Sequence, residues 1–392
     1  MFIFLILSCQ SKISTKDYTI HDANNAMELA SSHYKLMLSS IPDTLLPRTV
    51  SKNNKLELVK SHDWTSGFFP GVLWNLYTYN NNAIYKKQAI QYTNLIKNQQ
   101  YNHSTHDLGF MLYCSYGNGY SITNDTAYKK ILLNGAKTLS SRFNTKVGCI
   151  KSWDWNPDWQ FPVIVDNMMN LEYLLWAFNN SNDSIYYHQA ISHADITLKN
   201  HFRPDNSSCH MIDYDTITGA IIEKITVQGY ADDSAWSRGQ AWGLYGYTMM
   251  YQKTKKKRYL IQAQKIVDFI FSHPNMPTDL IPYWDYNAPN IPDAPRDVSA
   301  ATIIASALLE LQHHVAIQKK NIYFNNAKTI LNNLSSDVYT AKVGTNNNFI
   351  LKHSTGYLPK GKEIDVPLIY ADYYYIEALL RYIEIENMTY KN

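Results

Sequence analysis

Asp107 and Asp166 are the side chains of this 392-residue sequence best suited to acid–base chemistry. Asp166 lies near the start of residues 161–178, a segment that is apolar on nearly every side and that we predict to be a buried helix. A carboxylate there costs several kcal/mol unless it is paired or kept neutral. Asp166 is therefore either a capping residue that binds backbone N–H groups or a working acid. Asp107 also lies at a predicted helix start, so it is either a cap or a second carboxylate facing the same cavity.

A tryptophan-rich loop leads directly into the Asp166 segment. Trp153, Trp155 and Trp159 are separated by only one and three residues. So many indoles in one loop are hard to explain by core packing alone, and we expect them to form an aromatic collar. By excluding water, the collar would raise the pKa of the carboxyl group below it. A second ionised carboxylate nearby would raise that pKa further, which predicts a group that is protonated near neutral pH and can donate a proton.

Arg238 stands in an unusual place for a cation. It lies between Trp236 and Trp242 in the predicted first turns of a helix, where the macrodipole favours negative charge. A bound anion, such as a substrate carboxylate, would explain the position together with the N–H groups of the helix start. The alternative is an ion pair with Asp232 or Asp233.

Aromatic residues are unusually frequent, with 9 Trp, 31 Tyr and 13 Phe. Flat side chains stack well on sugar rings, so carbohydrate handling is the first hypothesis for function, and the alternative is that these residues fill a helical core. Trp64 presents the same choice locally. It precedes Thr65, Ser66 and Gly67 at a predicted helix start, and is either a wall for a sugar ring or a hydrophobic staple.

Several classes of function have little support in the sequence. The net charge is only +3 and no long basic run accompanies it, so we expect no nucleic-acid partner. The four cysteines have neither metal-ligand spacing nor the pattern of a disulfide framework. His103 and His106 are followed by no third ligand at a credible spacing, so we expect no metal site there.

The N-terminus has the character of a targeting segment. Residues 1–9 are mostly apolar, are too short to span a bilayer and are followed by a polar stretch, as in a secretory signal. Leu7-Ser8-Cys9 resembles a bacterial lipobox, in which the cysteine becomes lipidated. We therefore predict a signal or lipoprotein-like segment over residues 1–20 and a lipid anchor on Cys9, in a protein exported to the periplasm or the outer membrane.

Helical periodicity identifies the elements that must position these side chains. Loops rich in Pro, Gly and Asn separate the periodic segments. The predicted helices span residues 22–40, 65–80, 84–98, 107–117, 124–142, 163–180, 183–201, 232–252, 256–272, 297–318, 320–338 and 366–386.

Six helix pairs without a linker or a change of composition indicate one domain, residues 21–388, in which inner and outer helices alternate around a closed ring. The predicted fold is thus all-α, an (α/α)6 barrel whose long loops at one end carry the functional residues. Alternation over residues 219–227 predicts a short β-hairpin arm with residues 209–214. A helical solenoid would require a repeat of fixed length, and the sequence shows none.

Four motifs, in this order, resemble those of the unsaturated glucuronyl hydrolases, glycoside hydrolase family 88, and the resemblance runs from about residue 60 to the C-terminus. It implies an (α/α)6 barrel that needs no metal or organic cofactor. The implied substrates are oligosaccharides, made by a polysaccharide lyase, with a 4,5-unsaturated uronic acid at the non-reducing end. The implied reaction hydrates the C4=C5 vinyl ether, after which the hemiketal opens and the glycosidic bond breaks. The motifs are Trp64-Thr-Ser-Gly-Phe68, Thr105-His-Asp107-Leu-Gly-Phe110, Val165-Asp166-Asn-Met-Met-Asn170 and Asp232-Asp-Ser-Ala-Trp-Ser-Arg-Gly-Gln-Ala-Trp242.

The resemblance also implies roles for individual residues. Asp166 corresponds to the general acid/base that protonates C4 and activates the water that adds at C5. Asp107 corresponds to a second essential carboxylate, which holds ring hydroxyls and stabilises positive charge. Lys224 stands where the family pattern would place a glycine. The implied substrate-binding residues are Trp64, Trp153 and Trp236 as aromatic walls, His210, Gln228, Arg238 and Trp242, Lys224 and Thr226 near further sugar positions, and Tyr357, which would close the site.

Two alternatives remain at this stage. The related unsaturated rhamnogalacturonyl hydrolases share the barrel and the chemistry but differ in the sugar that follows the uronate. A non-catalytic sugar-binding barrel attached to a membrane belongs to another class. Chondroitin, hyaluronan, heparin-type chains and ulvan all yield unsaturated uronates after lyase action.

Overall fold

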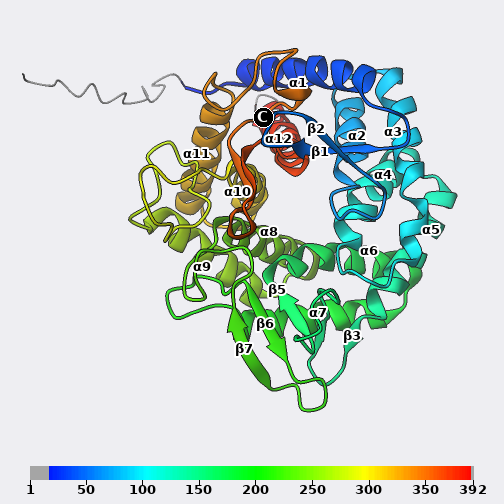
Figure 1. Ribbon diagram of the computed structural model, residues 1–392, viewed down its shortest axis with the longest axis vertical. Coiled ribbons are helices and arrows are strands. Elements are labelled where there is room, and N and C mark those ends of the chain that lie inside the picture. The colour runs from blue at the N-terminus through cyan, green and yellow to red at the C-terminus, as the bar shows by residue number, and fades with distance from the viewer. Residues whose placement is uncertain (1–16, 390–392) are drawn as a thin grey trace, which may run out of the picture.

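Six inner helices form a closed ring in the computed structural model, which describes residues 17–389 (Figure 1). Neighbours in the ring pack side by side in chain order, and α12 closes the ring by packing against both α10 and α2. Because these helices contact others on all sides, α8 and α10 are buried almost all round. The inner helices are α2 (Phe68–Asn80), the π-helix η2 (Gly109–Gly117) continued by α4 (Asn118–Thr123), α6 (Leu171–Ser181), α8 (Ser237–Thr254), α10 (Val298–Leu311) and α12 (Ile369–Thr389).

Six outer helices surround this ring and alternate with the inner ones along the chain, as the sequence predicted. Each buries one stripe against the inner ring and exposes the opposite face, which is the pattern of an amphipathic surface helix. They are α1 (Ile20–Ser40), α3 (Ala83–Leu95), α5 (Thr126–Ser140), α7 (Ser184–Asn200), α9 (Lys257–Ser272) and α11 (Ile317–Leu334).

Short turns of one recurring design join inner helices to the next outer helices. Asn81, Asn124 and Asn182 each end an inner helix in the left-handed conformation, which asparagine tolerates. The residue that follows each of them caps the next outer helix with its side chain, as Asp125 does for α5. The long connections therefore lie at the opposite end of the ring, at the N-termini of the inner helices.

Small β-sheets are built from those long connections. β1 (Leu46–Val50) pairs with β2 (Leu56–Val59), and β8 (Ser354–Tyr357) pairs with β9 (Lys362–Val366). β3 (Phe143–Asn144) and β4 (Cys149–Ile150) form a minimal hairpin. The predicted arm is present as β6 (Met211–Tyr214) and β7 (Ile221–Ile225), which project from the ring in Figure 1. A third strand, β5 (Pro162–Ile164), pairs with β6 and ties the arm to the segment that contains Asp166.

The prediction of one helix over residues 163–180 was wrong in its first part. Residues 162–164 form β5, residues Val165–Asn170 form the 3-10 helix η3, and the α-helix begins only at Leu171. Pro162 has no N–H to donate, and the β-branched Val163 and Ile164 suit a strand. Asp166 consequently lies on a tight turn between a strand and a helix. The segment predicted over 107–117 is the π-helix η2, a form that often marks functional sites.

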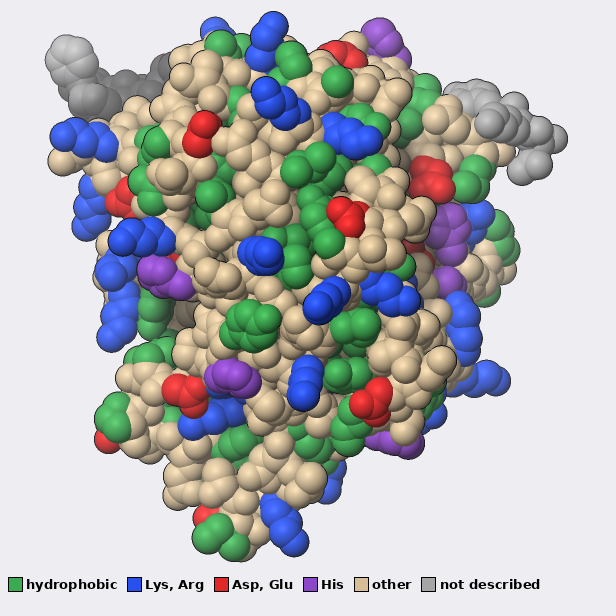
Figure 2. Space-filling view, turned by 90° about the vertical axis from the view of Figure 1, so that its right-hand side faces the viewer, with side chains coloured by type: hydrophobic (Ala, Val, Ile, Leu, Met, Phe, Trp, Pro, Cys, Tyr) green, Lys and Arg blue, Asp and Glu red, His purple; other side chains and the backbone are tan. Residues whose placement is uncertain are grey.

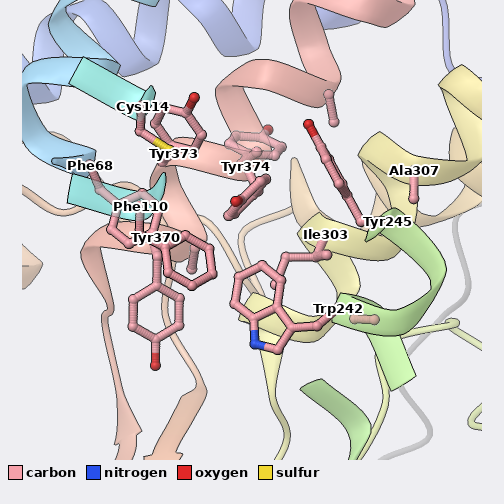
Figure 3. Packing of buried hydrophobic residues seen from close by; sticks show 14 of the residues in the cluster. Phe68, Phe110, Cys114, Trp242, Tyr245, Ile303, Ala307, Tyr370, Tyr373 and Tyr374 are labelled. Carbon is pink, nitrogen blue, oxygen red and sulfur yellow. The ribbon is translucent and has the colours of Figure 1, made fainter. Parts of the chain in front are cut away.

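A cluster of aromatic side chains fills the interior of the ring (Figure 3). Phe110 contacts Trp242 with ring centroids 5.1 Å apart, and Trp242 contacts Tyr374 at 5.4 Å. Phe68 contacts Tyr373 at 5.3 Å. Such pairs are each worth about 0.5–1.5 kcal/mol beyond the area they bury, so most of the aromatic excess is explained by core packing rather than by sugar binding.

On the face of the molecule shown in Figure 2, lysine and arginine side chains are scattered among neutral and acidic ones. None of the helices in the described part of the chain is long and apolar enough to cross a membrane. Cys9 and most of the predicted signal segment, residues 1–20, lie outside the described residues.

Candidate active site

A cavity of about 390 Å³ opens at the end of the ring where the long connections meet. Ligand pockets typically fall between about 300 and 1,000 Å³. The walls come from the segments that precede the inner helices and from β1, β8 and β9. They include seven residues that the sequence predicted, namely Trp64, Asp107, Trp153, Asp166, Gln228, Arg238 and Tyr357. Asp107 and Asp166 therefore face one shared cavity, as predicted.

Asp166 is a buried carboxyl group that still reaches the cavity, with 8% of the residue exposed. It does not cap η3, because the N-cap position is Ile164 and the backbone N–H that contacts the Asp166 carboxyl group is its own. Its Oδ2 atom has no hydrogen-bond partner among residues 17–389. Burial raises the pKa of Asp166 to about 7, the positive charge of Arg238 and the indole N–H of Trp242 oppose this shift, and the charge of Asp107 adds to it. The predicted elevation and the predicted contribution of the second carboxylate are both present.

Asp107 is held in place by its sequence neighbours. Thr105 Oγ1 donates a 2.6 Å hydrogen bond to Asp107 Oδ2, and the backbone N–H of Asp107 donates back to the same hydroxyl over 3.1 Å. The Nε2 atom of the fully buried His106 lies 3.3 Å from Asp107 Oδ1. No side chain caps η2, so the capping explanation is wrong for Asp107 too. The hydrogen bond from Thr105 and the nearby His106 ring therefore hold the Asp107 carboxylate beside the cavity.

His210 faces Asp166 as a neutral donor. Its Nδ1 accepts hydrogen bonds from the backbone N–H groups of Val227, at 2.9 Å, and Gln228, at 3.3 Å, so the ring proton must lie on Nε2. Burial is the largest cause that lowers the pKa of His210, to about 3, and Arg238 lowers it further. Nε2 lies 3.9 Å from Asp166 Oδ2, too far for a direct hydrogen bond. Both atoms lack a hydrogen-bond partner among residues 17–389, so an oxygen of water or substrate in contact with both would satisfy them.

Arg238 is buried and held by three acceptors. Its Nη1 donates to Asp297 Oδ2 at 2.6 Å and to the carbonyl of Thr355 at 2.7 Å, and its Nη2 donates to the carbonyl of Gly356 at 2.6 Å. Pairing with Asp232 or Asp233 is therefore wrong. The partner is Asp297, which caps α10 and lies 59 residues further along the chain. The guanidinium still lines the cavity and places a positive charge close to Asp166.

The predicted aromatic collar is present at the mouth of the cavity. Trp153 packs against Trp155 and Trp159, with ring centroids 5.6 and 6.0 Å apart. Trp153 and Trp155 line the cavity, and Trp155 remains 59% exposed. Trp64 packs against Phe68, Phe110 and Tyr370 and also lines the cavity. Trp64 is thus both a packing residue and a wall.

Five predicted binding residues lie outside the cavity lining: His210, described above, and four others. Trp236 packs behind His210 and over the guanidinium of Arg238, and Trp242 lies below Asp166 in the core. Thr226 supports a loop by accepting a hydrogen bond from the N–H of Gly229. Lys224 extends from β7 and donates to the carbonyl of Asn200 at 2.6 Å. Trp236 and Trp242 therefore position other side chains of the site, whereas Lys224 and Thr226 belong to the arm and its loop.

Sequence reasoning missed several residues of the cavity wall. Arg48 comes from β1, and Lys362 and Glu363 come from β9. Both hairpins interrupt a helical pattern without a recognisable motif of their own. Tyr370 was hidden in the predicted helix 366–386, where an aromatic residue is expected to be core. No group of three His, Cys, Asp or Glu side chains in residues 17–389 could hold a metal ion.

No protein-family model matches the chain. Among curated proteins, an unsaturated glucuronyl hydrolase of Formosa agariphila is 45% identical over 384 residues, which cover 96% of this chain and 95% of that protein. A crystal structure of an unsaturated glucuronyl hydrolase specific for heparin is 48% identical and superposes with a TM-score of 0.92 over 94% of this chain and 99% of that one. A mutant enzyme of this kind from Streptococcus agalactiae, solved in complex with dGlcA-GalNAc6S, is 26% identical with a TM-score of 0.81, covering 94% of this chain and 93% of that one.

Proposed function

The chain belongs to the unsaturated glucuronyl hydrolases, and from this premise we propose that Asp166 is the acid/base that removes a 4,5-unsaturated uronic acid from the non-reducing end of lyase-made oligosaccharides. The observation that carries the proposal is that Asp166 and Asp107 face one cavity while the pKa of Asp166 is raised to about 7. A carboxyl group with that pKa is half protonated at neutral pH. It can both give a proton to carbon and take one from water.

The first step is hydration of the vinyl ether. The protonated Asp166 gives its proton to C4, and positive charge develops at C5 and on the ring oxygen. The Asp166 carboxylate then takes a proton from the water that adds at C5, which restores the acid. Asp166 Oδ2 and His210 Nε2, 3.9 Å apart, flank a position where one oxygen can bind to both. His210 donates its N–H to this oxygen, and Asp166 accepts a proton from it.

Bond cleavage follows from the product of that hydration. The new hemiketal opens to a ketone at C5, which leaves a hemiacetal at C1. The hemiacetal collapses to an aldehyde and releases the remaining sugar as an alcohol. The protein forms no covalent bond at C1, so the spacing of Asp107 and Asp166 need not follow the rules for inverting or retaining glycosidases.

Asp107 and Arg238 have complementary electrostatic roles in this proposal. Asp107, oriented by Thr105 and His106, holds a ring hydroxyl and stabilises the positive charge that develops at C5. Arg238 offers a fixed positive charge to the uronate carboxylate, because Asp297 and the β8 carbonyls hold the guanidinium before substrate binds. Gln228 and the tryptophan walls complete the binding of the sugar ring.

The proposal is tested by the near-UV absorbance of the conjugated double bond. Incubation with lyase-made disaccharides should abolish this signal, and Asp166→Asn should stop the loss while it leaves substrate binding nearly intact. An unchanged signal with every lyase product would refute hydrolysis by this chain, and a wild-type rate for Asp166→Asn would refute the assignment of the acid. A panel of defined unsaturated disaccharides, including heparin-type ones because of the heparin-specific relative, would rank the substrates and separate uronyl from rhamnogalacturonyl hydrolysis.

Export with a lipid anchor on Cys9 is a second part of the proposal, supported by the apolar residues 1–9 and the Leu7-Ser8-Cys9 sequence. Mass spectrometry of the protein from a bacterial membrane fraction should then find Cys9 as a lipidated N-terminal residue. Detection of unmodified residues 1–9 in the mature protein would refute it.

A further inference from the structure

A second cavity, of about 790 Å³, lies between the β1–β2 and β8–β9 hairpins and adjoins the candidate active site. We call it the hairpin groove. The two cavities share the walls formed by Arg48, Tyr357, Lys362 and Glu363. The far side of the groove is built by the β1–β2 turn and the loop before β8, which contribute Ser51, Lys52, Asn54, Glu57 and Asn346.

We infer that the hairpin groove binds the reducing-end sugars of acidic oligosaccharides longer than a disaccharide. This inference rests on the proposed function, in which the unsaturated uronate occupies the cavity beside Asp166. Every further sugar of the chain must then leave that cavity across its rim. The hairpin groove begins at that rim and offers about twice the volume of the site itself.

The lining of the hairpin groove suits a polyhydroxyl chain that carries negative charge. Asn54, Asn346 and Ser51 offer both donors and acceptors to sugar hydroxyls. Two of its carboxylates are already bound to cations: Glu363 lies 2.7 Å from Arg48, and Asp365 lies 2.5 Å from His353. Lys52 and Lys362, by contrast, have no ion-pair partner among residues 17–389. Glu57, the third carboxylate of the lining, also has no ion-pair partner in the described chain, so the uncommitted charges of the groove are two ammonium groups and one carboxylate.

The shared wall is fixed before any ligand binds. Arg48 bridges Glu363 and Asp63, with both N–O distances 2.7 Å. Gly356 lets the Glu363 side chain lie against β8, because a Cβ atom at position 356 would come within 2.2 Å of Glu363 Oε2. The wall between the two cavities is thus a preformed edge over which an oligosaccharide can pass.

Unusual backbone conformations are concentrated around the hairpin groove. Asn54, Asn346, Glu363 and Asp365 line it with φ angles of 55°, 54°, 52° and 56°. Asparagine and aspartate tolerate the left-handed region, but it is unfavourable for Glu363. Strain of this kind collects at ligand clamps, where the surrounding structure holds it in place. The shape of the groove is therefore maintained at a cost in stability, as expected for a binding surface.

Comparison of a disaccharide with a tetrasaccharide of the same repeat tests the inference. We expect Lys52→Ala to lower kcat/KM for the unsaturated tetrasaccharide about three- to fivefold, the effect of one partly exposed charge contact. Lys52→Glu should lower it about tenfold, and both variants should leave disaccharide kinetics unchanged. Lys55→Ala is the matched control, since Lys55 lies in the same turn, is exposed and does not line the groove.

Three other outcomes have distinct meanings. Equal kinetics of wild type, Lys52→Ala and Lys52→Glu on the tetrasaccharide would overturn the groove assignment while the disaccharide assay still supports the proposed function. Loss of activity on both substrates in the Lys52 variants, with unchanged thermal unfolding, would also overturn it, because Lys52 would then act on the site itself. If wild-type protein turned over neither substrate, the proposed function would be refuted, and the inference that rests on it would fall with it.

Discussion

Two buried aspartates, Asp166 and Asp372, have the same perturbed pKa and opposite surroundings. Burial raises the pKa of each to about 7. Asp372 is completely inaccessible and binds three donors: Tyr34 Oη at 3.1 Å, the N–H of Ile350 at 2.9 Å and the N–H of Leu351 at 3.0 Å. Asp166 keeps one oxygen unsatisfied and faces a cavity. A raised pKa alone therefore does not identify a catalytic acid. Access and an unused acceptor distinguish the acid from the structural carboxylate.

The largest effect that follows from this contrast is on turnover. Asp166→Asn removes the proton donor while it keeps the shape of the side chain, and we expect kcat to fall about 10²–10⁴-fold. The free energy of unfolding should not fall, because the variant replaces a poorly solvated acid that lacks a partner for Oδ2. Steady-state kinetics and urea unfolding measure the two quantities. A large loss of stability would mean that Asp166, like Asp372, is a structural residue.

The reciprocal change is Asp372→Ala, whose effect should fall on stability. It leaves one hydroxyl and two backbone N–H groups buried without an acceptor. The hydrogen bonds that join α12 to α1 and to residues 350–351 through this side chain are then lost. We expect a loss of about 3 kcal/mol in the free energy of unfolding. Activity per folded molecule should be unchanged at a temperature well below the transition. A fall in kcat of more than tenfold in folded protein would contradict the division of roles.

The pH dependence separates the same two groups. Asp166 must be protonated to act, so kcat should fall about tenfold per pH unit once the pH exceeds its pKa of about 7. For stability, both folded-state pKa values lie above the unfolded value, so the folded state binds more protons between pH 4 and 7. Each group therefore loses up to about 1.4 kcal/mol of its contribution to stability per pH unit as the pH rises through that window.

Variants assign these two pH effects to their groups. Asp166→Asn should remove one part of the pH dependence of unfolding and abolish the alkaline limb of the activity profile. Asp372→Ala should remove a similar part of the stability dependence and leave the activity profile unchanged. An alkaline limb that moves in the Asp372 variant would show that the two sites are coupled through α12.

The pattern of apolar residues alone could not have separated these aspartates. Both stand near the start of an apolar helical segment, Asp166 before Leu171-Glu-Tyr-Leu-Leu and Asp372 before Tyr373-Tyr-Tyr-Ile. What made Asp166 recognisable was its context, a tryptophan loop just before it and a family motif. The fold was predictable for a related reason, since helical periodicity and capping residues are local features.

Contacts distant along the chain were not predictable. Arg238 has two acidic residues within six positions, yet its partner is Asp297, because the ring brings the starts of α8 and α10 together. Arg48, Lys362 and Glu363 reach the cavity wall only because two hairpins from opposite ends of the chain meet there. Lys224 is the opposite case. It stands at a position of the family pattern, yet its side chain donates to the carbonyl of Asn200 and does not line the cavity.

Among the three aspartates, the smallest effect is expected at Asp107, which combines features of both others. It faces the cavity as Asp166 does, yet its Oδ2 atom accepts a hydrogen bond, as the oxygens of Asp372 do. Thr105→Val keeps the shape of the neighbour and removes the 2.6 Å hydrogen bond to Asp107 Oδ2. One hydrogen bond to a charged group is worth about 1.5 kcal/mol, so kcat should fall roughly tenfold. KM should change little if Asp107 acts mainly on the charge that develops in the transition state.

The control for Thr105→Val is Ser104→Ala, because Ser104 is one residue away and its hydroxyl donates to Asn102 instead. An unchanged kcat in Thr105→Val would mean that His106 alone positions the carboxylate, and a change confined to KM would show that Asp107 binds the sugar ring without stabilising its transition state.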